Sequence, residues 1–236
     1  MSEIRILVLA NSIRKHPCRC IAGREVVSTN PFVFGPWVRP VSRKSAGELT
    51  QFERQLPDGT DPRLLDIIAV PVDETTGEPD QPENHYISGQ PWKRVGRVHP
   101  GVLVRLVENP HSLWIEEGKR CDRISAEALQ PVPSGHQSLY LIRPEDLELR
   151  FWTDYNLADG KHKRTRLAVF RYAGVTYDLA LTDPLIAERH VPQFPEVEDG
   201  TVTVPLPHGT MLCVSLTHPW QGHHYKVAAT VFESRT

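Results

Sequence analysis

Proline is the residue that most restricts how this chain can fold. It occurs 21 times in 236 residues, and only two methionines are present. Because proline lacks a backbone N–H and interrupts helices, long helices are not expected. The apolar residues fall instead into strand-sized runs, such as residues 6–10 and 227–229. The sequence therefore predicts a mainly β protein with a few short helices.

The predicted strands fall into two groups. About six are expected before residue 110 and about five after residue 138. Between them, Pro-Val-Pro-Ser-Gly at residues 131–135 has the composition of a linker. We therefore expect an N-terminal domain over residues 1–135 and a C-terminal domain over residues 136–236. These strand counts suit two small OB-like β-barrels in tandem, and they suit a single large sandwich nearly as well.

Two short helices are predicted before the second group of strands. Leu49, Phe52 and Leu56 lie at spacings of three and four, which predicts a helix over residues 47–56 with these side chains on its apolar face. A weaker pattern predicts a helix over residues 125–129. Both helices would be connecting elements of a β protein.

The second group contains a hairpin and one more helix. Ala173-Gly174 predicts a tight connection between two strands. Residues 182–190 predict a compact helix, with Thr182 or Asp183 as its N-cap and Pro184 in its first turn.

The sequence also predicts the cellular compartment of the protein. No run approaches the roughly 18 apolar residues that a membrane helix needs. The first residues lack the basic and apolar regions of a signal peptide. Four cysteines are too few for a disulfide scaffold in a chain of this length. We therefore expect a soluble, cytoplasmic protein that does not associate with membranes.

Charge is unevenly distributed, although the formal net charge is only −2. Residues 1–44 carry eight lysines and arginines against two acids, and residues 45–88 carry ten acids against two arginines. A second basic run, residues 161–166, contains no acid. Such runs are typical of solvated loop faces, but two of them beside strands also fit a cleft that attracts a polyanion.

The segment from residue 10 to residue 23 combines hydroxyl, amide, glycine and cationic groups directly after the first strand. Its fixed cations are Arg14, Lys15 and Arg19. These side chains and the backbone N–H groups could converge on phosphate oxygens. No P-loop and no Gly-x-Gly-x-x-Gly motif occurs, which disfavours nucleoside triphosphate hydrolysis. The alternative is a connecting loop in which Asn11 and Ser12 cap the local backbone.

The extended segment 37–42 carries an aromatic and a cationic side chain two residues apart. Trp37 and Arg39 share one face, and Ser42 lies on the other. The pair could stack on a base and contact its phosphate. On this interpretation Arg39→Ala weakens binding without unfolding the protein. The alternative is a tryptophan packed into the core beside a surface arginine.

Two further segments carry candidate contacts. Residues 220–226 place aromatic rings, imidazoles and a lysine at the entry to the last strand. Strand alternation turns Tyr225 and Lys226 to opposite faces, so only one of them can meet a ligand. In the second basic run, the candidate phosphate contacts are Lys161, Lys163 and Arg164.

Metal binding and catalysis find less support. His16, Cys18 and Cys20 are potential metal donors, but Cys-x-Cys is closer than the usual zinc spacing and no second pair follows. We therefore predict no metal and no cofactor. Cys20, next to Arg19, and the acid Asp178 are candidates for an enzyme acting on a nucleotide or a modified base. No signature defines a partner for either, so no catalytic residue is assigned.

Five segments taken together carry a family resemblance. They are Leu-Ala-Asn-Ser-Ile-Arg-Lys at 9–15, Arg-Cys-Ile-Ala-Gly at 19–23, Trp-Val-Arg-Pro-Val-Ser at 37–42, Tyr-Asp-Leu-Ala-Leu-Thr-Asp-Pro at 177–184, and Val-Ser-Leu with Tyr-Lys-Val-Ala over 214–228. This set resembles the prokaryotic dual OB-containing domain family over nearly the whole chain. The resemblance implies two OB folds and, by analogy with that fold, nucleic-acid recognition in a defence or repair setting.

The leading prediction is a non-enzymatic module that binds nucleic acid, with single-stranded DNA or RNA preferred. Its predicted contact residues are Ser12, Arg14, Lys15, Arg19, Trp37, Arg39, Ser42, Lys161, Lys163, Arg164, Tyr225 and Lys226. One alternative is the enzyme described above. The other is a protein-interaction adaptor whose acidic loop at residues 73–83 docks a basic partner.

Overall fold

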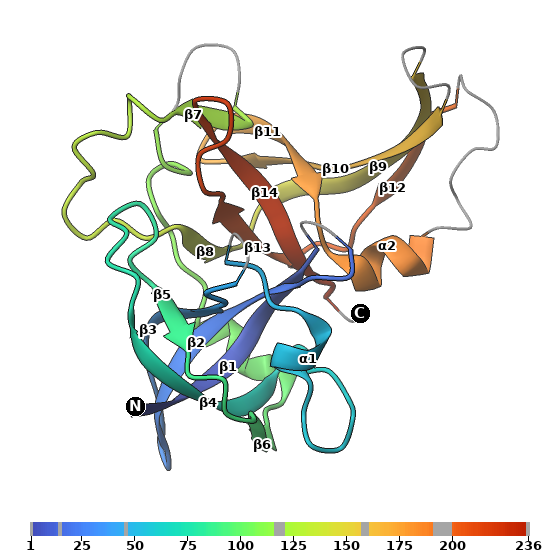
Figure 1. Ribbon diagram of the computed structural model, residues 1–236. Coiled ribbons are helices and arrows are strands. Elements are labelled where there is room, and N and C mark those ends of the chain that lie inside the picture. Colours follow the sequence, from blue (N-terminus) through green and yellow to red (C-terminus); the bar gives the residue numbers. More distant parts are fainter. Residues whose placement is uncertain are drawn as a thin grey trace. The chain divides into compact units, whose positions relative to one another are not determined.

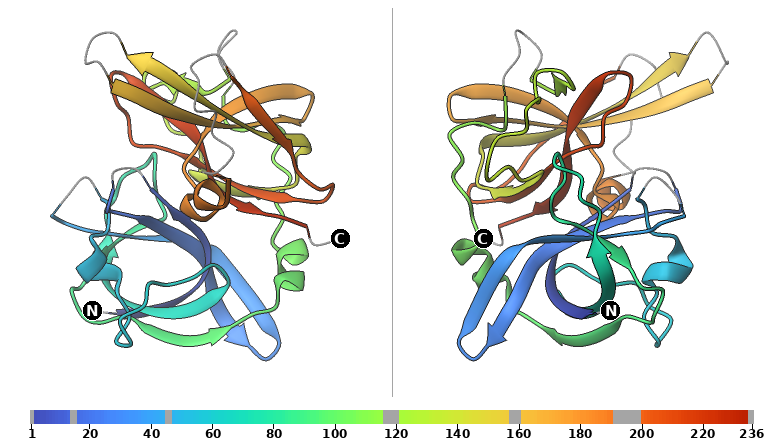
Figure 2. Two further views of the ribbon diagram at one scale, coloured as in Figure 1. Left: turned by 90° about the vertical axis from the view of Figure 1, so that its right-hand side faces the viewer. Right: turned by 60° about the vertical axis from the view of Figure 1, so that its left-hand side comes forward.

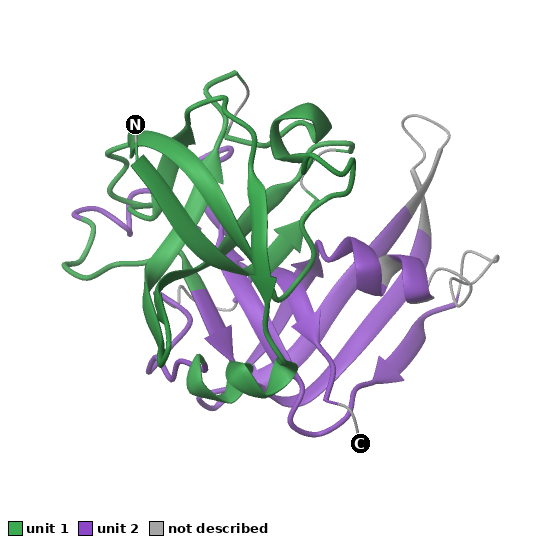
Figure 3. Cartoon of the chain, turned by 90° about the horizontal axis from the view of Figure 1, so that it is seen from below, with its two compact units in different colours: residues 1–106, 132–139 green, residues 107–131, 140–236 purple. Residues whose placement is uncertain are grey.

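The computed structural model describes residues 2–13, 16–44, 47–115, 121–156, 161–190 and 200–234. The chain forms two compact units (Figure 3). Unit 1 contains residues 1–106 and 132–139, and unit 2 contains residues 107–131 and 140–236. The expected division at a single point after residue 135 therefore differs from the observed one, because the chain enters unit 2 at residue 107 and returns to unit 1 for residues 132–139.

Unit 1 is built mainly from strands (Figure 1). Its elements are β1 (Ser2–Ser12), β2 (Cys20–Thr29), β3 (Phe32–Val41), α1 (Gln51–Arg54), β4 (Asp66–Thr75), β5 (Asn84–Ile87), β6 (Lys93–Arg97) and the 3-10 helix η1 (Pro100–Arg105). The strand order is β1-β2-β3-β5-β4, and β4 also pairs with β1, which closes a five-stranded barrel. The β3–β5 pairing is parallel and the others are antiparallel. β6 pairs with β4 and extends the sheet.

The barrel encloses an apolar core. Its members include Ile6, Val8, Val38, Ile68 and Trp92, all at most 2% exposed. Burial of each such side chain contributes about 1.5–3 kcal/mol relative to exposure. The close approach of β1 and β2 depends on a glycine: a Cβ added at Gly23 would lie 1.9 Å from the carbonyl oxygen of Leu7. Gly23 pairs with Val8, where the register of the two strands shifts.

The first predicted helix is shorter than expected. α1 covers only Gln51–Arg54, and it begins with a capping box in which Thr50 and Glu53 satisfy each other's backbone N–H groups. Leu49 is buried as expected, but Phe52 is 90% exposed. The predicted apolar face was therefore wrong at Phe52, because four helical residues form only about one turn and cannot present a continuous stripe.

Buried polar contacts attach the returning segment 132–139 to unit 1. Glu83 accepts hydrogen bonds from the hydroxyl of Ser138 and forms an ion pair of 3.1 Å with Arg39. The Arg39 guanidinium also donates to the Ser138 hydroxyl over 2.9 Å. The His136 imidazole donates to the carbonyl oxygen of Asp80 over 3.0 Å. These contacts explain why a proline-rich stretch with the composition of a linker belongs to a folded unit.

Unit 2 repeats the strand path of unit 1. Its elements are β7 (Arg123–Ser125), β8 (Leu139–Ile142), β9 (Glu145–Asn156), β10 (Lys161–Tyr172), β11 (Val175–Leu181), α2 (Pro184–His190), β12 (Val202–Pro205), β13 (Met211–Leu216) and β14 (His223–Phe232). Three antiparallel strands lead to a parallel β11–β14 pair, and β13 then pairs antiparallel with β14. The path β9-β10-β11-β14-β13 is the counterpart of β1-β2-β3-β5-β4. The prediction of a mainly β chain with tandem OB-like units is thereby confirmed.

The helix and hairpin predictions in unit 2 are confirmed in part. Asp183 caps α2, because its Oδ1 accepts hydrogen bonds from the N–H groups of Leu185 and Ile186. Ala173 and Gly174 both have positive φ, at 50° and 81°, in the two-residue connection of β10 and β11. The helix predicted over residues 125–129 was wrong: Ser125 ends β7, and a turn follows in which its hydroxyl accepts from Ala128 N.

The chain after β6 forms a short 3-10 helix and not a further strand. Residues 100–105 form η1, which His99 caps by accepting a hydrogen bond from the N–H of Gly101.

Within the described ranges, no helix has the length and apolar character needed to cross a membrane.

Candidate nucleic-acid interface

Three aromatic or imidazole rings and one guanidinium gather at the beginning of β14. We call this group the aromatic platform; it consists of Arg123, Trp220, His223 and Tyr225. The centre of the Tyr225 ring lies 6.0 Å from the centre of the Trp220 ring and 6.4 Å from the centre of the His223 ring. Trp220 is 56% exposed, which is high for a large apolar side chain. The platform therefore offers an aromatic surface to solvent.

A tight turn puts Trp220 and His223 on the same face. The N–H of each donates to the carbonyl oxygen of the other, over 2.8 and 3.1 Å. The two residues between them, Gln221 and Gly222, have φ values of 50° and 78°. Positive φ at both central residues is the requirement of a type I′ hairpin turn, and the Gly at the second position suits it. The backbone thus fixes the spacing of the two rings.

Arg123 reaches the platform from a neighbouring strand. β7 pairs antiparallel with the start of β14, with Arg123 opposite Tyr225, and Figure 1 shows β7 beside this end of β14. The guanidinium carbon of Arg123 lies 4.9 Å from the centre of the Tyr225 ring. Asp122 accepts two hydrogen bonds from Arg123, over 3.0 and 2.6 Å, and this raises the pKa of the guanidinium. The arrangement keeps a permanent positive charge against an aromatic ring.

The other face of β14 is closed. His224 is 2% exposed, and its imidazole bonds to the carbonyl oxygen of Thr217 over 2.9 Å. Lys226 is 1% exposed, and its Nζ donates to the carbonyl oxygen of Ile115 over 3.2 Å. Alternation along the strand therefore separates Tyr225 from Lys226 as the sequence indicated. A contact between Lys226 and a phosphate is not compatible with this buried position.

The second basic run lies in β10 and pairs with β9. Lys161, Lys163 and Arg164 are opposite Asn156, Asp154 and Thr153 in the ladder. Arg164 is exposed; the side chains of Lys161 and Lys163 lie outside the described part. Farther along β10, Arg171 pairs with Glu145 over 2.8 Å. The run itself contains no acid, and this ion pair with β9 lies at the opposite end of β10 from the run.

In unit 1 most of the predicted contact residues that the structure describes are buried. Trp37 is 3% exposed, and the guanidinium carbon of Arg24 lies 6.0 Å from the centre of its ring. Arg39 is 7% exposed and is engaged by Glu83. The stacking and phosphate contact predicted for this pair requires accessible groups. The structure instead gives Trp37 a packing role and Arg39 a structural one.

The remaining predicted residues of unit 1 have local roles. Ser42 is 2% exposed and donates to Glu53 over 2.7 Å, next to the cap of α1. Ser12 is 9% exposed and pairs with Cys20 at the end of β1. The backbone of Arg19 forms a bridge with Leu49, with N···O distances of 2.9 and 2.8 Å. Arg14 and Lys15 lie outside the described residues.

Ion pairs connect the basic and acidic stretches of the N-terminal half. Arg43 pairs with Glu74 over 2.9 Å, and this hydrogen bond raises the pKa of the guanidinium. Asp66, 1% exposed at the carboxylate side chain, contacts Arg94 over 3.2 Å and Arg97 over 3.0 Å. These contacts and the Arg39–Glu83 pair join acids and bases that lie in separate stretches of the sequence.

The candidate catalytic and metal-binding residues do not form a comparable group among the residues that the structure describes. Cys18 and Cys20 are half-buried, and Asp178 is exposed on β11. In the described part of the chain, no three side chains of His, Cys, Asp or Glu are grouped so that they could hold a metal ion.

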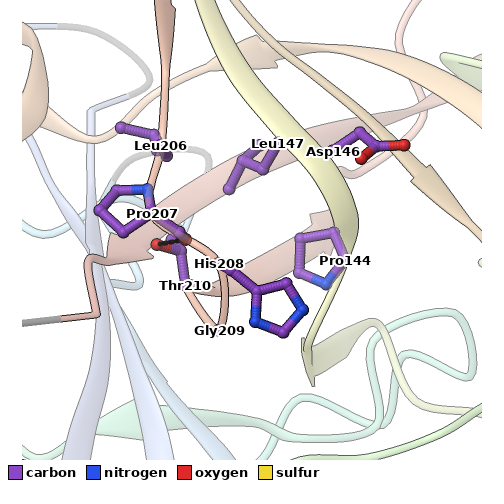
Figure 4. A pocket seen from close by; sticks show the side chains of 8 residues that line it. All are labelled: Pro144, Asp146, Leu147, Leu206, Pro207, His208, Gly209 and Thr210. Atoms are coloured by element: carbon purple, nitrogen blue, oxygen red, sulfur yellow. Dashed lines mark hydrogen bonds between the residues drawn. The ribbon is translucent and has the colours of Figure 1, made fainter. Parts of the chain in front are cut away.

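A small hollow of about 110 Å³ lies in unit 2 (Figure 4). Its lining residues are Pro144, Asp146, Leu147, Leu206, Pro207, His208, Gly209 and Thr210. The Asp146 carboxylate points away from the other lining side chains and pairs with Arg171 over 3.2 Å. The Thr210 hydroxyl donates to the carbonyl oxygen of Pro207. The lining residues include no lysine or arginine, so the hollow offers no fixed cation to a nucleotide phosphate.

The platform was only partly predicted. The sequence segment 220–226 was recognised, but Arg123 was not, since only the pairing of β7 with β14 brings it to Tyr225. A signal for Trp220 and His223 was present in the Gln221-Gly222 dipeptide between them, which favours a tight hairpin.

A closed five-stranded Greek-key barrel, followed by a unit with the same strand path, defines a tandem OB-fold protein. A family model described as Dual OB-containing domain matches residues 4–231. The chain therefore belongs to the dual OB-containing domain family, as the sequence resemblance indicated. No curated protein and no solved structure matches it.

Proposed function

We propose that this protein binds single-stranded nucleic acid and that the aromatic platform of unit 2 stacks on its bases. The observation that carries the proposal is the exposed Trp220 ring beside Tyr225, with the Arg123 guanidinium 4.9 Å from that second ring. Stacking on aromatic side chains is tolerant of sequence, because every base has a π face. The proposal is thus for a binding module without strict sequence preference.

The position of the platform in the fold supports this proposal. OB folds bind oligonucleotides with the face of their second and third strands and with the loops after the first and fourth strands. β13 and β14 correspond to the fourth and fifth strands of unit 2, and Trp220 lies in the loop between them. The platform is therefore at one of the positions where the fold presents ligand contacts.

Cations of β10 complete the proposed interface. β9 and β10 correspond to the first and second strands of the same unit, and Arg164 is exposed on β10. Phosphate contacts from arginine and lysine supply most of the affinity for a nucleic acid regardless of its sequence. We propose that Arg164, with Lys161 and Lys163, contacts the phosphates while the platform contacts bases. Arg14, Lys15 and Arg19 remain proposed phosphate contacts of unit 1.

The acidic loop supports the adaptor alternative less well. Glu83 is buried in its ion pair with Arg39. Glu78 accepts hydrogen bonds from Asn84 and Thr76, over 3.1 and 3.0 Å. These two acids hold the loop in place, and the acids left at the surface include Glu74, which is 68% exposed and pairs with Arg43.

The test is the affinity of the full chain for a fluorescein-labelled 20-nucleotide oligo(dT) or oligo(rU), measured by anisotropy. Trp220→Ala should weaken binding about 5- to 150-fold, because stacking contributes about 1–3 kcal/mol per base. Phe52→Ala is the matched control, since Phe52 is an even more exposed aromatic, on α1 of unit 1.

Two results would contradict the proposal. One is equal affinity of the wild-type chain and the Trp220→Ala variant, with both folded by circular dichroism. The other is the absence of binding by the wild-type chain at low salt, where phosphate contacts are strongest.

A further inference from the structure

The guanidinium of Arg123 is held at one edge by a carboxylate and lies against an aromatic ring. Arg123 is directly opposite Tyr225 in the ladder of β7 with the beginning of β14 (Figure 2). Side chains directly opposite each other share a face, and the guanidinium carbon lies 4.9 Å from the centre of the Tyr225 ring. Along its edge, Nε donates to Oδ1 of Asp122 over 3.0 Å, and Nη2 donates to Oδ2 over 2.6 Å.

This two-point contact with Asp122 fixes the orientation of the guanidinium plane. A guanidinium is flat, and two parallel N–H···O bonds to one carboxylate set its geometry as well as its position. One hydrogen bond alone would leave the group free to turn about that bond. Asp122 therefore determines which way the flat face of Arg123 points.

The charges of the two side chains make Arg123 a poor contact for a phosphate. Asp122 and Arg123 form an ion pair whose formal charges cancel. A phosphate that approaches the guanidinium also approaches the carboxylate, which repels it. A flat guanidinium has another use, because unpaired bases stack on arginine planes as they do on aromatic rings. The Arg123 side chain is 26% exposed, so part of it can be reached by a ligand.

We propose that the guanidinium plane of Arg123 stacks on a nucleobase and that Asp122 is the positioning residue for that plane. This inference rests on the proposed function and deepens it. The aromatic platform then has two stacking surfaces, the exposed ring of Trp220 and the guanidinium of Arg123. Both surfaces require bases that are not already stacked and paired in a duplex, so the ligand class is an unpaired base.

The charge of Asp122 gives the inference a distinctive sign. If Asp122 acted on the ligand only through its charge, removing a carboxylate next to bound phosphates would strengthen binding. If it holds the plane of Arg123, the same change weakens binding. An asparagine at this position has one acceptor oxygen, so its side chain cannot repeat the two-oxygen contact.

The test is the affinity of the full chain for the fluorescein-labelled 20-nucleotide oligo(dT), measured by anisotropy over a salt series. Arg123→Lys keeps the charge and removes the plane. It should weaken binding about 3- to 30-fold and leave the slope of log affinity against log salt unchanged. Arg150→Lys is the matched control, because Arg150 is also held by an acid, Glu148, but lies on β9 outside the platform. Its affinity should equal that of the wild-type chain.

A double-mutant cycle tests the role of Asp122. Asp122→Asn should weaken binding at least about threefold when Arg123 is present, and it should not weaken binding further in the Arg123→Lys background. A merely structural role of Asp122 would weaken binding equally in both backgrounds. Asp122→Asn preserves the size of the side chain, so it tests the inference even where Arg123→Lys fails to fold by circular dichroism.

Several outcomes would overturn the inference. Wild-type affinity of Arg123→Lys, with weakened binding by Trp220→Ala, would refute the stacking of Arg123 and leave the proposed function intact. If Arg123→Ala also made the salt slope less negative by about 0.7, Arg123 would be a phosphate contact. Stronger binding by Asp122→Asn would show that the carboxylate only repels the ligand. Absence of binding by the wild-type chain would overturn the inference together with the proposed function.

Discussion

The guanidinium of Arg39 lies 3.1 Å from the carboxylate of Glu83, and these two side chains are 9% and 3% exposed. Ser138 bonds to both of them, so three distant parts of the sequence meet in one buried polar cluster. The cluster joins β3, the end of the acidic loop and the returning segment 132–139. Arg39 is thus a component of the fold of unit 1, in the place where the sequence had indicated a phosphate contact.

Arg39→Ala is expected to destabilise the protein. Removing one member of a buried ion pair leaves the other charge without compensation, which costs about 3–5 kcal/mol. Chemical denaturation monitored by circular dichroism measures this loss. Arg43→Ala is the control, because the Arg43–Glu74 pair is 48% and 68% exposed and exposed ion pairs contribute little to stability. Equal stability of the Arg39→Ala variant and the wild-type chain would refute the structural role.

Gly23→Ala is expected to disturb the barrel of unit 1. The added Cβ would lie 1.9 Å from a backbone oxygen and 2.7 Å from a backbone carbon of Leu7, so β1 and β2 would have to separate. A cost of about 3 kcal/mol is expected from such overpacking. Gly96→Ala in β6 is the control, since its new Cβ would meet only the side chain of Ile67 at 3.8 Å. Thermal unfolding of the two variants compares them, and similar melting temperatures would argue against the close approach.

Asp183 should make stability depend on pH in a direction opposite to that of most carboxylates. Burial raises the pKa of Asp183, although hydrogen bonds from the N–H groups of Val231, Ile186 and Leu185 act in the other direction. The folded chain then retains the proton to higher pH than the unfolded chain. The contribution of Asp183 to the free energy of unfolding therefore falls as pH rises from about 4 through the raised pKa.

Asp183→Asn removes this titration and tests the direction. The amide retains one oxygen for the cap of α2 but presents an NH₂ group to Val231 N, so the variant should be less stable by about 1–3 kcal/mol. The stability advantage of the wild-type chain should shrink with rising pH across that window and stay constant above it. Urea denaturation from pH 4 to pH 8 gives the profile. An advantage that grows with pH would show that the hydrogen bonds outweigh burial.

The salt dependence of oligonucleotide binding should report the phosphate contacts. For a single strand, the slope of log affinity against log salt is about −0.7 for each phosphate contacted, so five contacts would give about −3.5. Arg164→Gln should make the slope less negative by about 0.7. Arg150→Gln on β9 is the comparison, because Arg150 pairs with Glu148 over 2.5 Å and lies outside the proposed contacts, so its loss should leave the slope unchanged. A slope unaffected by Arg164→Gln would remove Arg164 from the interface.

Local features of this protein could be predicted because they depend on neighbours in sequence. The capping of α2 by Asp183, the positive φ values at Ala173 and Gly174, and the opposite orientation of Tyr225 and Lys226 all follow from residue type and strand alternation. The predominance of strands over helices followed from the abundance of proline. The resemblance of five segments to a family was sufficient to anticipate two OB-like units.

Features that depend on distant pairing could not be predicted in the same way. Phe52 has the spacing of a core residue, but α1 is too short to turn it inward. Arg123 reaches Tyr225 only because β7 pairs with β14. The shared strand path of the two units could not be predicted from an internal repeat either. Corresponding strands need only similar patterns of burial, and their residues can differ.

Charge shows the division most clearly. The sequence by itself determined that strands predominate, which residues form the β10–β11 turn and cap α2, and how many acids and bases the chain carries. Only the tertiary structure decided which charges remain available, because pairing depends on distances of a few ångström between residues tens of positions apart. It placed Arg39 against Glu83 and Arg43 against Glu74, and it left the exposed ring of Trp220 beside Tyr225 and Arg123. Salt screens exposed charges beyond about 10 Å, and rings stack only in contact, so the charges and rings that can act together are set by tertiary contacts that composition does not contain.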